Sequence, residues 1–119
     1  MKFLPKAARA AFAVLDWPDA PISLVLVNEA KIRELNKKYR HKNKITDVLS
    51  FEELNEIFIC LPQAKRQAKL LKTPLKTELT RLLTHGIVHL KGYDHERSKS
   101  AELEMRKIEN RILVGIFNP

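Results

Sequence analysis

Hydrophobic and polar residues alternate along this chain with two different periods. In residues 3–15, in residues 29–39 and in most of the chain after residue 61, apolar side chains recur every three or four positions, as on a helix with one buried face. Short apolar runs rich in β-branched residues lie between these stretches, and such runs favour buried strands. The pattern predicts an α+β protein, in which about five helices pack on a small mixed sheet of three to four strands.

The bounds of these elements follow from the same pattern. The predicted strands are Ile22–Val27, Val48–Phe51 and Ile57–Leu61. The short gap between the last two strands indicates a hairpin. The predicted helices run from residue 3 to 15, from Asn28 to about Tyr39, from Pro62 to about Leu71, from Thr73 to Lys91 or Gly92, and from Ser98 or Ser100 to Gly115.

Particular residue types indicate where the helices begin and end. Asn28 and Thr73 are typical N-caps, because their side-chain oxygens accept a hydrogen bond from an amide of the first turn. Pro62 and Pro74 stand in first turns, where a missing amide proton costs nothing. Gly92 permits the left-handed conformation that ends many helices, so we expect a helix to end there.

The apolar stripes also predict which side chains face the core. In the second helix these are Ala30, Ile32, Leu35 and Tyr39, and in the last helix they are Leu103, Met105, Ile108, Ile112 and Leu113. The helix that begins at Thr73 is the most apolar, so we expect it to be central.

Composition and charge narrow the function. The 119 residues fit one domain, residues 1–119, and the formal net charge is +8. Two basic stretches carry much of this charge. They contain Lys31, Arg33, Lys37, Lys38, Arg40, Lys42 and Lys44 in the first, and Lys65, Arg66, Lys69, Lys72, Lys76 and Arg81 in the second. Each is either a nucleic-acid contact or a solvated helix face, and the first favours nucleic acid slightly.

Cysteine content and hydropathy indicate the compartment. Cys60 is the single cysteine and lies in an apolar run, which fits a reducing environment. No run approaches the eighteen or so apolar residues that a membrane span needs. We therefore expect a cytoplasmic protein that does not bind membranes.

Three of the four histidines lie close together in the sequence. His85 and His89 are four residues apart, so on a helix their side chains share one face. His95 follows shortly after Gly92, which allows the chain to turn back toward the first two. Satisfied core or surface histidines are the ordinary alternative, but three clustered imidazoles favour a metal site.

Three neutral imidazoles suit zinc or a similar divalent ion and leave it one open coordination position. Such an ion lowers the pKa of coordinated water to about 7. Residue 86 is Gly, whereas the metalloprotease helix places its general base there, so this is not that motif. The alternatives from other classes are a protein with a structural metal and a general metallohydrolase. A structural zinc site usually needs four protein ligands, and only three are evident.

These residues closely resemble the YbeY endoribonucleases, also called ribosomal RNA maturation factors. The resemblance is carried by two motifs. They consist of His85, Gly86, His89, Leu90, Gly92, Tyr93, Asp94 and His95 in one, and Leu35, Asn36, Tyr39, Arg40 and Thr46 to Phe51 in the other. The similarity covers nearly everything from Ile22 to the end.

The resemblance implies a zinc-dependent, single-strand-specific endoribonuclease that matures the 3′ end of 16S ribosomal RNA and acts in ribosome quality control. Its implied partners are ribosomal RNA and the small ribosomal subunit. The alternative in the same setting is a ribosome-assembly factor with a structural metal. The implied zinc ligands are His85, His89 and His95, and the implied functional arginine is Arg40.

A mechanism follows from these assignments. We expect Arg40 to offer a planar, bidentate fork to the scissile phosphate. His85 would act with it in catalysis. The neighbouring Lys37, Lys38, Lys42 and Lys44, together with Arg40, would hold the RNA backbone.

Two departures from the family pattern carry structural expectations. The family usually has Gly-Asp just before the third strand, and this chain has Asn55-Glu56, which puts the turn in question. Family members commonly begin with an additional strand, so we expect one strand fewer here.

Overall fold

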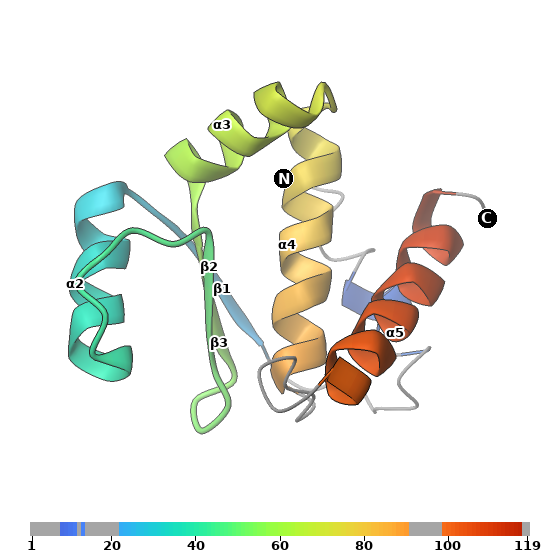
Figure 1. Cartoon of the computed structure of the whole chain (residues 1–119), viewed down its shortest axis with the longest axis horizontal. Coiled ribbons are helices and arrows are strands. Elements are labelled where there is room, and N and C mark those ends of the chain that lie inside the picture. Colours follow the sequence, from blue (N-terminus) through green and yellow to red (C-terminus); the bar gives the residue numbers. More distant parts are fainter. Residues whose placement is uncertain (1–7, 12, 14–21, 91–98, 118–119) are drawn as a thin grey trace.

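The computed structural model describes residues 8–11, 13, 22–90 and 99–117, the last three through their backbone alone. In these residues a three-stranded sheet separates α2 from α4 and α5, as Figure 1 shows. The strands are β1 (Ser23–Val27), β2 (Val48–Phe51) and β3 (Glu56–Cys60), and the helices are α2 (Glu29–Arg40), α3 (Leu61–Leu71), α4 (Leu75–Leu90) and α5 (Lys99–Phe117). Residues 8–11 and 13 are also helical. The predicted α+β class is confirmed.

The central strand of the sheet is β3. It pairs with β1 in parallel, with Leu24 opposite Ile57, and with β2 in antiparallel fashion, with Leu49 opposite Phe58. The predicted hairpin between β2 and β3 is therefore confirmed. Both remaining strands are edges within this sheet, and β1 is only half-buried, because Val25 and Leu26 are 36% and 38% exposed. The prediction that the first strand is buried was wrong for this reason.

Asn55 closes the turn that leads into β3. Its φ of 50° lies in the left-handed region, which Asn tolerates better than most residues other than Gly. Its carbonyl accepts a 3.0 Å hydrogen bond from the amide of Ser23, so the same turn also anchors the start of β1. Asn55 thus supports the backbone conformation for which a glycine is suited, and Glu56 then begins the strand.

Successive side chains of β3 point to opposite faces of the sheet and so serve two cores. Ile57 and Ile59 pack with the apolar side of α4 and α5. Cys60 is fully buried on the other face, with Ile32 of α2 and Leu49 of β2. Because β3 is covered on both faces, it reads as a continuous apolar run.

Helix α4 occupies the centre of the molecule, as predicted. It contacts β2, β3, α3 and α5. Its buried apolar residues are Leu79, Leu82, Leu83, Ile87, Val88 and Leu90. Gly86 faces the sheet so closely that a Cβ there would lie 3.0 Å from Ile57 Cγ2 and 3.1 Å from Ser50 Oγ. The glycine therefore sets how closely the histidine-bearing helix approaches the sheet.

Two predicted core positions of α2 were wrong. Ala30 is exposed, and Tyr39 is 52% exposed and rests one edge of its ring on Phe51, with 5.1 Å between ring centroids. Phe51 ends β2, so the last turn of α2 reaches the limit of the sheet and cannot bury a whole ring. Asn36 is buried on this helix together with Ile32.

The predicted inward position of Leu103 in α5 was also wrong. Met105 and Ile112 are buried and face α4, whereas Leu103 is 55% exposed. Two residues along a helix rotate a side chain by about 200°, so Leu103 and Met105 cannot share a face. Gly115 does not end α5 either, because the helix continues to Phe117.

The junction between α3 and α4 differs from the predicted cap. Lys72 adopts φ 55°, and the amide of Thr73 donates to the carbonyl of Ala68 at 3.0 Å, which is a Schellman ending of α3. The carbonyl of Pro74 accepts the amides of Thr77 and Glu78, so Pro74 precedes the first helical residue. Thr73 takes part in ending α3, and its buried Oγ1 makes no hydrogen bond to any residue that the structure describes. The predicted end of α4 at residue 91 or 92 lies outside the described residues.

Candidate active site

Two histidines lie side by side near the end of α4. His85 and His89 are one helical turn apart, and their rings meet edge to face with 4.7 Å between centroids. Both side chains are partly exposed on a helix whose other positions are mostly buried. The pair therefore presents imidazole nitrogens at the surface of the core helix, where a metal ion or substrate has access.

His85 also contacts the C-terminal helix. Its Nδ1 lies 2.5 Å from Oε1 of Glu109 in α5. An ionised carboxylate only accepts hydrogen bonds, so Nδ1–H is the donor. The sequence pattern did not single out Glu109, because it stands 24 residues from His85 on a different helix.

The third predicted zinc ligand, His95, lies outside the described residues. Within residues 8–11, 13, 22–90 and 99–117, no group of three or more His, Cys, Asp or Glu side chains is placed to hold a metal ion. The His85 and His89 imidazoles nevertheless form a nitrogen donor pair of the kind that zinc accepts.

Arg40 lies at the end of α2 and is oriented by two contacts. Its Nη2 donates a 2.6 Å hydrogen bond to the carbonyl of Ser50, and its guanidinium carbon lies 5.7 Å from the centre of the Phe51 ring. The remaining guanidinium N–H groups make no hydrogen bond to any described residue. Arg40 is thus held on one side and keeps further donors for a ligand.

Ser50 connects Arg40 to the histidine helix. Its carbonyl accepts from Arg40, while its hydroxyl donates to the carbonyl of Gly86 in α4 at 3.2 Å. Ser50 is only 8% exposed, so its hydrogen bond to Gly86 is shielded from water, whereas the bond from Arg40 is only partly buried. This link sets the position of the guanidinium relative to His85, which adjoins Gly86.

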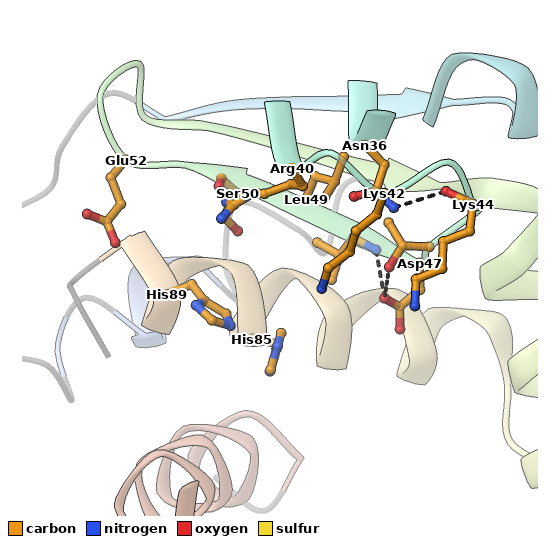
Figure 2. A pocket seen from close by; sticks show the side chains of 12 residues that line it. Asn36, Arg40, Lys42, Lys44, Asp47, Leu49, Ser50, Glu52, His85 and His89 are labelled. Carbon is orange, nitrogen blue, oxygen red and sulfur yellow. Dashed lines mark hydrogen bonds between the residues drawn. The ribbon is translucent and has the colours of Figure 1, made fainter. Parts of the chain in front are cut away.

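A cavity of about 590 Å³ lies between these groups. Figure 2 shows His85 and His89 on α4 at one side, with Arg40 and Lys42 facing them from the other side. Lys44 also lines this cavity. Of the predicted RNA-binding residues, Lys37 and Lys38 do not line it. Both are exposed on α2, and the Lys38 ammonium lies 5.3 Å from the centre of the Tyr39 ring.

Two polar residues of the second motif, to which sequence reasoning assigned no role of their own, shape the cavity wall. Asn36 is 3% exposed, and its Nδ2 donates to the carbonyl of Lys44 at 2.9 Å, which ties the 41–47 loop to α2. Asp47 accepts the amide of Val48 at 2.8 Å through one oxygen and Gln67 Nε2 at 3.3 Å through the other. The available signal was that Asn36 stands one helical turn after Ile32, so it lies on the buried face of α2.

A buried charge network supports this wall from behind. Glu78 of α4 is 1% exposed and accepts from Gln67 at 2.6 Å and from Arg81 at 2.6 and 2.9 Å. The hydrogen bonds that Arg81 donates to Glu78 are the main reason that the pKa of Arg81 lies above its usual value, and desolvation opposes this shift. Because Gln67 also contacts Asp47, the network joins α3 and α4 to the cavity.

Comparison with known proteins shows which family this arrangement resembles. The sequence model of the family described as Endoribonuclease YbeY matches residues 3–116. The Endoribonuclease YbeY of Aquifex aeolicus is 42% identical, over 92% of this chain and 79% of that protein. The Endoribonuclease YbeY of Persephonella marina is 37% identical, over 97% and 82%.

A solved structure has a similar fold. The solution structure of TM1509 from Thermotoga maritima superposes with a TM-score of 0.69 at 28% identity, covering 98% of this chain and 82% of that one. In the part of this chain that the structure describes, none of the helices combines the length and the apolar character needed to cross a membrane.

Proposed function

Because this chain belongs to the Endoribonuclease YbeY family, we propose that it is a metal-dependent endoribonuclease that cleaves single-stranded RNA. We propose further that zinc is the metal and that the enzyme acts in the cytoplasm. Its substrate would be precursor ribosomal RNA. The reaction would mature the 3′ end of 16S ribosomal RNA and serve ribosome quality control, in contact with the small ribosomal subunit.

One observation carries the proposal. The guanidinium of Arg40 and the imidazoles of His85 and His89 line the same cavity, although they come from α2 and α4 on opposite sides of the sheet (Figure 2). A cation with spare donors facing a pair of metal-ligating nitrogens suits a phosphodiester, which has negative oxygens for both.

The chain's own residues explain how RNA would be held. Arg40 would donate hydrogen bonds to the non-bridging oxygens of the scissile phosphate, with its orientation maintained by the Ser50 carbonyl. Lys42 and Lys44 line the same cavity and would attract neighbouring phosphates, which makes binding weaken as salt increases. Charge that develops on the phosphate would then meet donors that are already oriented.

The donor set fits zinc in the described part of the site. His85 and His89 would supply two nitrogen ligands, and we propose His95 as the third. When bound, zinc would supply a Lewis acid that polarises the phosphate and favours deprotonation of water at neutral pH.

The decisive experiment is cleavage of precursor ribosomal RNA by the purified protein, with and without a chelator. We expect Arg40→Ala to lower the cleavage rate about 10²–10³-fold, since it removes oriented transition-state donors. His89→Ala should lower the rate and the amount of bound zinc together. Lys38→Ala is the matched control, because Lys38 is a cation of the same helix outside the cavity.

Three outcomes would contradict the proposal. Cleavage at the normal rate by Arg40→Ala would remove its catalytic role. Activity that persists with chelator and in His89→Ala would indicate a contaminating nuclease. A protein that keeps one zinc equivalent but cleaves no RNA would favour a ribosome-assembly factor with a structural metal.

A further inference from the structure

One carboxylate of α5 reaches across to the histidine face of α4. Glu109 lies 2.5 Å from His85 Nδ1, and the two side chains are only 19% and 28% exposed. The proposed RNA contacts do not involve Glu109. Its contact with one of the proposed zinc ligands is therefore a feature that the proposed function leaves unexplained.

His85 lies between two cavities. One is the cavity shared with Arg40, and the other, of about 300 Å³, lies between α4 and α5 and is lined by Glu109, Arg81 and Arg106 among others. Glu109 lines only the second cavity. The Nδ1 atom of the imidazole thus contacts a residue of α5, while His85 also lines the cavity that Arg40 lines.

Two arginines lie close to the Glu109 carboxylate. Arg81 lies near enough for the charge of Glu109 to favour its protonated form, and Arg106 lines the same small cavity. Because a carboxylate oxygen accepts hydrogen bonds, the 2.5 Å contact with Oε1 places the proton on Nδ1 of His85. In a neutral imidazole the lone pair is then on Nε2, which is the form that a metal ion binds.

We propose that Glu109 is a positioning residue, which holds His85 in the Nδ1–H tautomer and in a fixed ring orientation so that Nε2 is presented to zinc. This inference rests on the proposed function for the identity of the ion. A carboxylate behind a metal-binding imidazole typically contributes about 10–100-fold to metal affinity. Glu109 would do this from α5, so the C-terminal helix becomes part of the site.

The test compares Glu109→Ala, Glu109→Gln and Glu102→Ala. Glu102 is the matched control, because it is a glutamate of the same helix whose carboxylate pairs with Arg106. The first measurement is the ¹⁵N spectrum of the imidazoles in the metal-free protein under mildly alkaline conditions, which reports the tautomer. The second is zinc affinity by competition with a chelating dye. Thermal unfolding is recorded for every variant.

We expect Glu109→Ala to lose the Nδ1–H preference at His85 and to bind zinc about 10–100-fold more weakly. Glu109→Gln should keep the tautomer, because its amide oxygen still accepts from Nδ1–H, and should bind zinc more tightly than Glu109→Ala. Glu102→Ala should match the wild type in both measurements. A purely structural role for Glu109 would lower the unfolding temperature and leave the tautomer of the folded fraction unchanged.

Two results would overturn the inference. The first is an unchanged His85 tautomer with unchanged zinc affinity in Glu109→Ala. The second is a switch to Nε2–H in Glu109→Gln. The second result remains informative if Glu109→Ala does not fold. Wild-type protein that cleaves no RNA, combined with weaker zinc binding by Glu109→Ala, would refute the proposed activity and support the positioning role.

Discussion

Gly86→Ala tests whether the glycine of α4 sets the distance between the histidine helix and the sheet. A Cβ at residue 86 would lie 3.0 Å from Ile57 Cγ2, 3.1 Å from Ile57 Cδ1 and 3.1 Å from Ser50 Oγ. Ile57 is fully buried in the central strand, and the Ser50 hydroxyl donates to the carbonyl of residue 86 itself. Neither neighbour can retreat without disturbing a packed face or a buried hydrogen bond.

Two opposing effects determine the magnitude. Alanine favours a helix over glycine by about 1 kcal/mol. Adding a methyl group to a packed interior costs about 1–3 kcal/mol. We therefore expect Gly86→Ala to lower the free energy of unfolding by about 1 kcal/mol, which for a chain of this length is a fall of about 4 °C in the unfolding temperature.

The assay is urea unfolding of Gly86→Ala, Ile57→Val and the double variant. Ile57→Val removes Cδ1, so the cost of Gly86→Ala should shrink in that background, with a coupling of about 0.5–1 kcal/mol. The reasoning would be refuted if Gly86→Ala raised stability by about 1 kcal/mol in both backgrounds. That is the gain from helix propensity alone, and it would mean that the close approach imposes no constraint.

Two further predictions concern the turn before β3 and the buried network behind the cavity. Asn55→Val should lower the free energy of unfolding by about 1–2 kcal/mol, because a β-branched residue resists φ 50°, whereas Asn55→Gly should change it little. Equal urea midpoints for Asn55→Val and the wild type would contradict this. Glu78→Ala should cost about 1–3 kcal/mol, because it leaves donors of Gln67 and Arg81 without their acceptor. Glu78→Gln should cost less, since it keeps an accepting oxygen, and equal losses in the two variants would argue against hydrogen bonding as the cause.

Sequence reasoning was accurate where neighbouring residues decide the structure. The side chain of Asn28 accepts the amide of Lys31 at 2.8 Å, as expected of an N-cap. The predicted strand Val48–Phe51 has the observed bounds. An N-cap is decided within about one helical turn, and a strand by the alternation of a few side chains, so both signals are local.

Sequence reasoning was wrong where the structure depends on another element of the fold. Tyr39 was expected to be buried, but the sheet ends at Phe51 and covers only part of its ring. Thr73 was expected to cap α4, but the chain uses it to close α3. The sequence around Tyr39 and around Thr73 is compatible with either arrangement. The extent of the sheet decides the first case, and the ending of the preceding helix decides the second.

The local order of residues determined that His85 and His89 share a face of one helix, because that follows from the helical period alone. Only the tertiary structure decided that Arg40 faces the same cavity and that Glu109 holds Nδ1 of His85. These pairs come from different helices, and their distances depend on how closely α4 packs against the sheet and against α5. Packing of this kind is a property of the whole core, and a single stretch of sequence does not encode it.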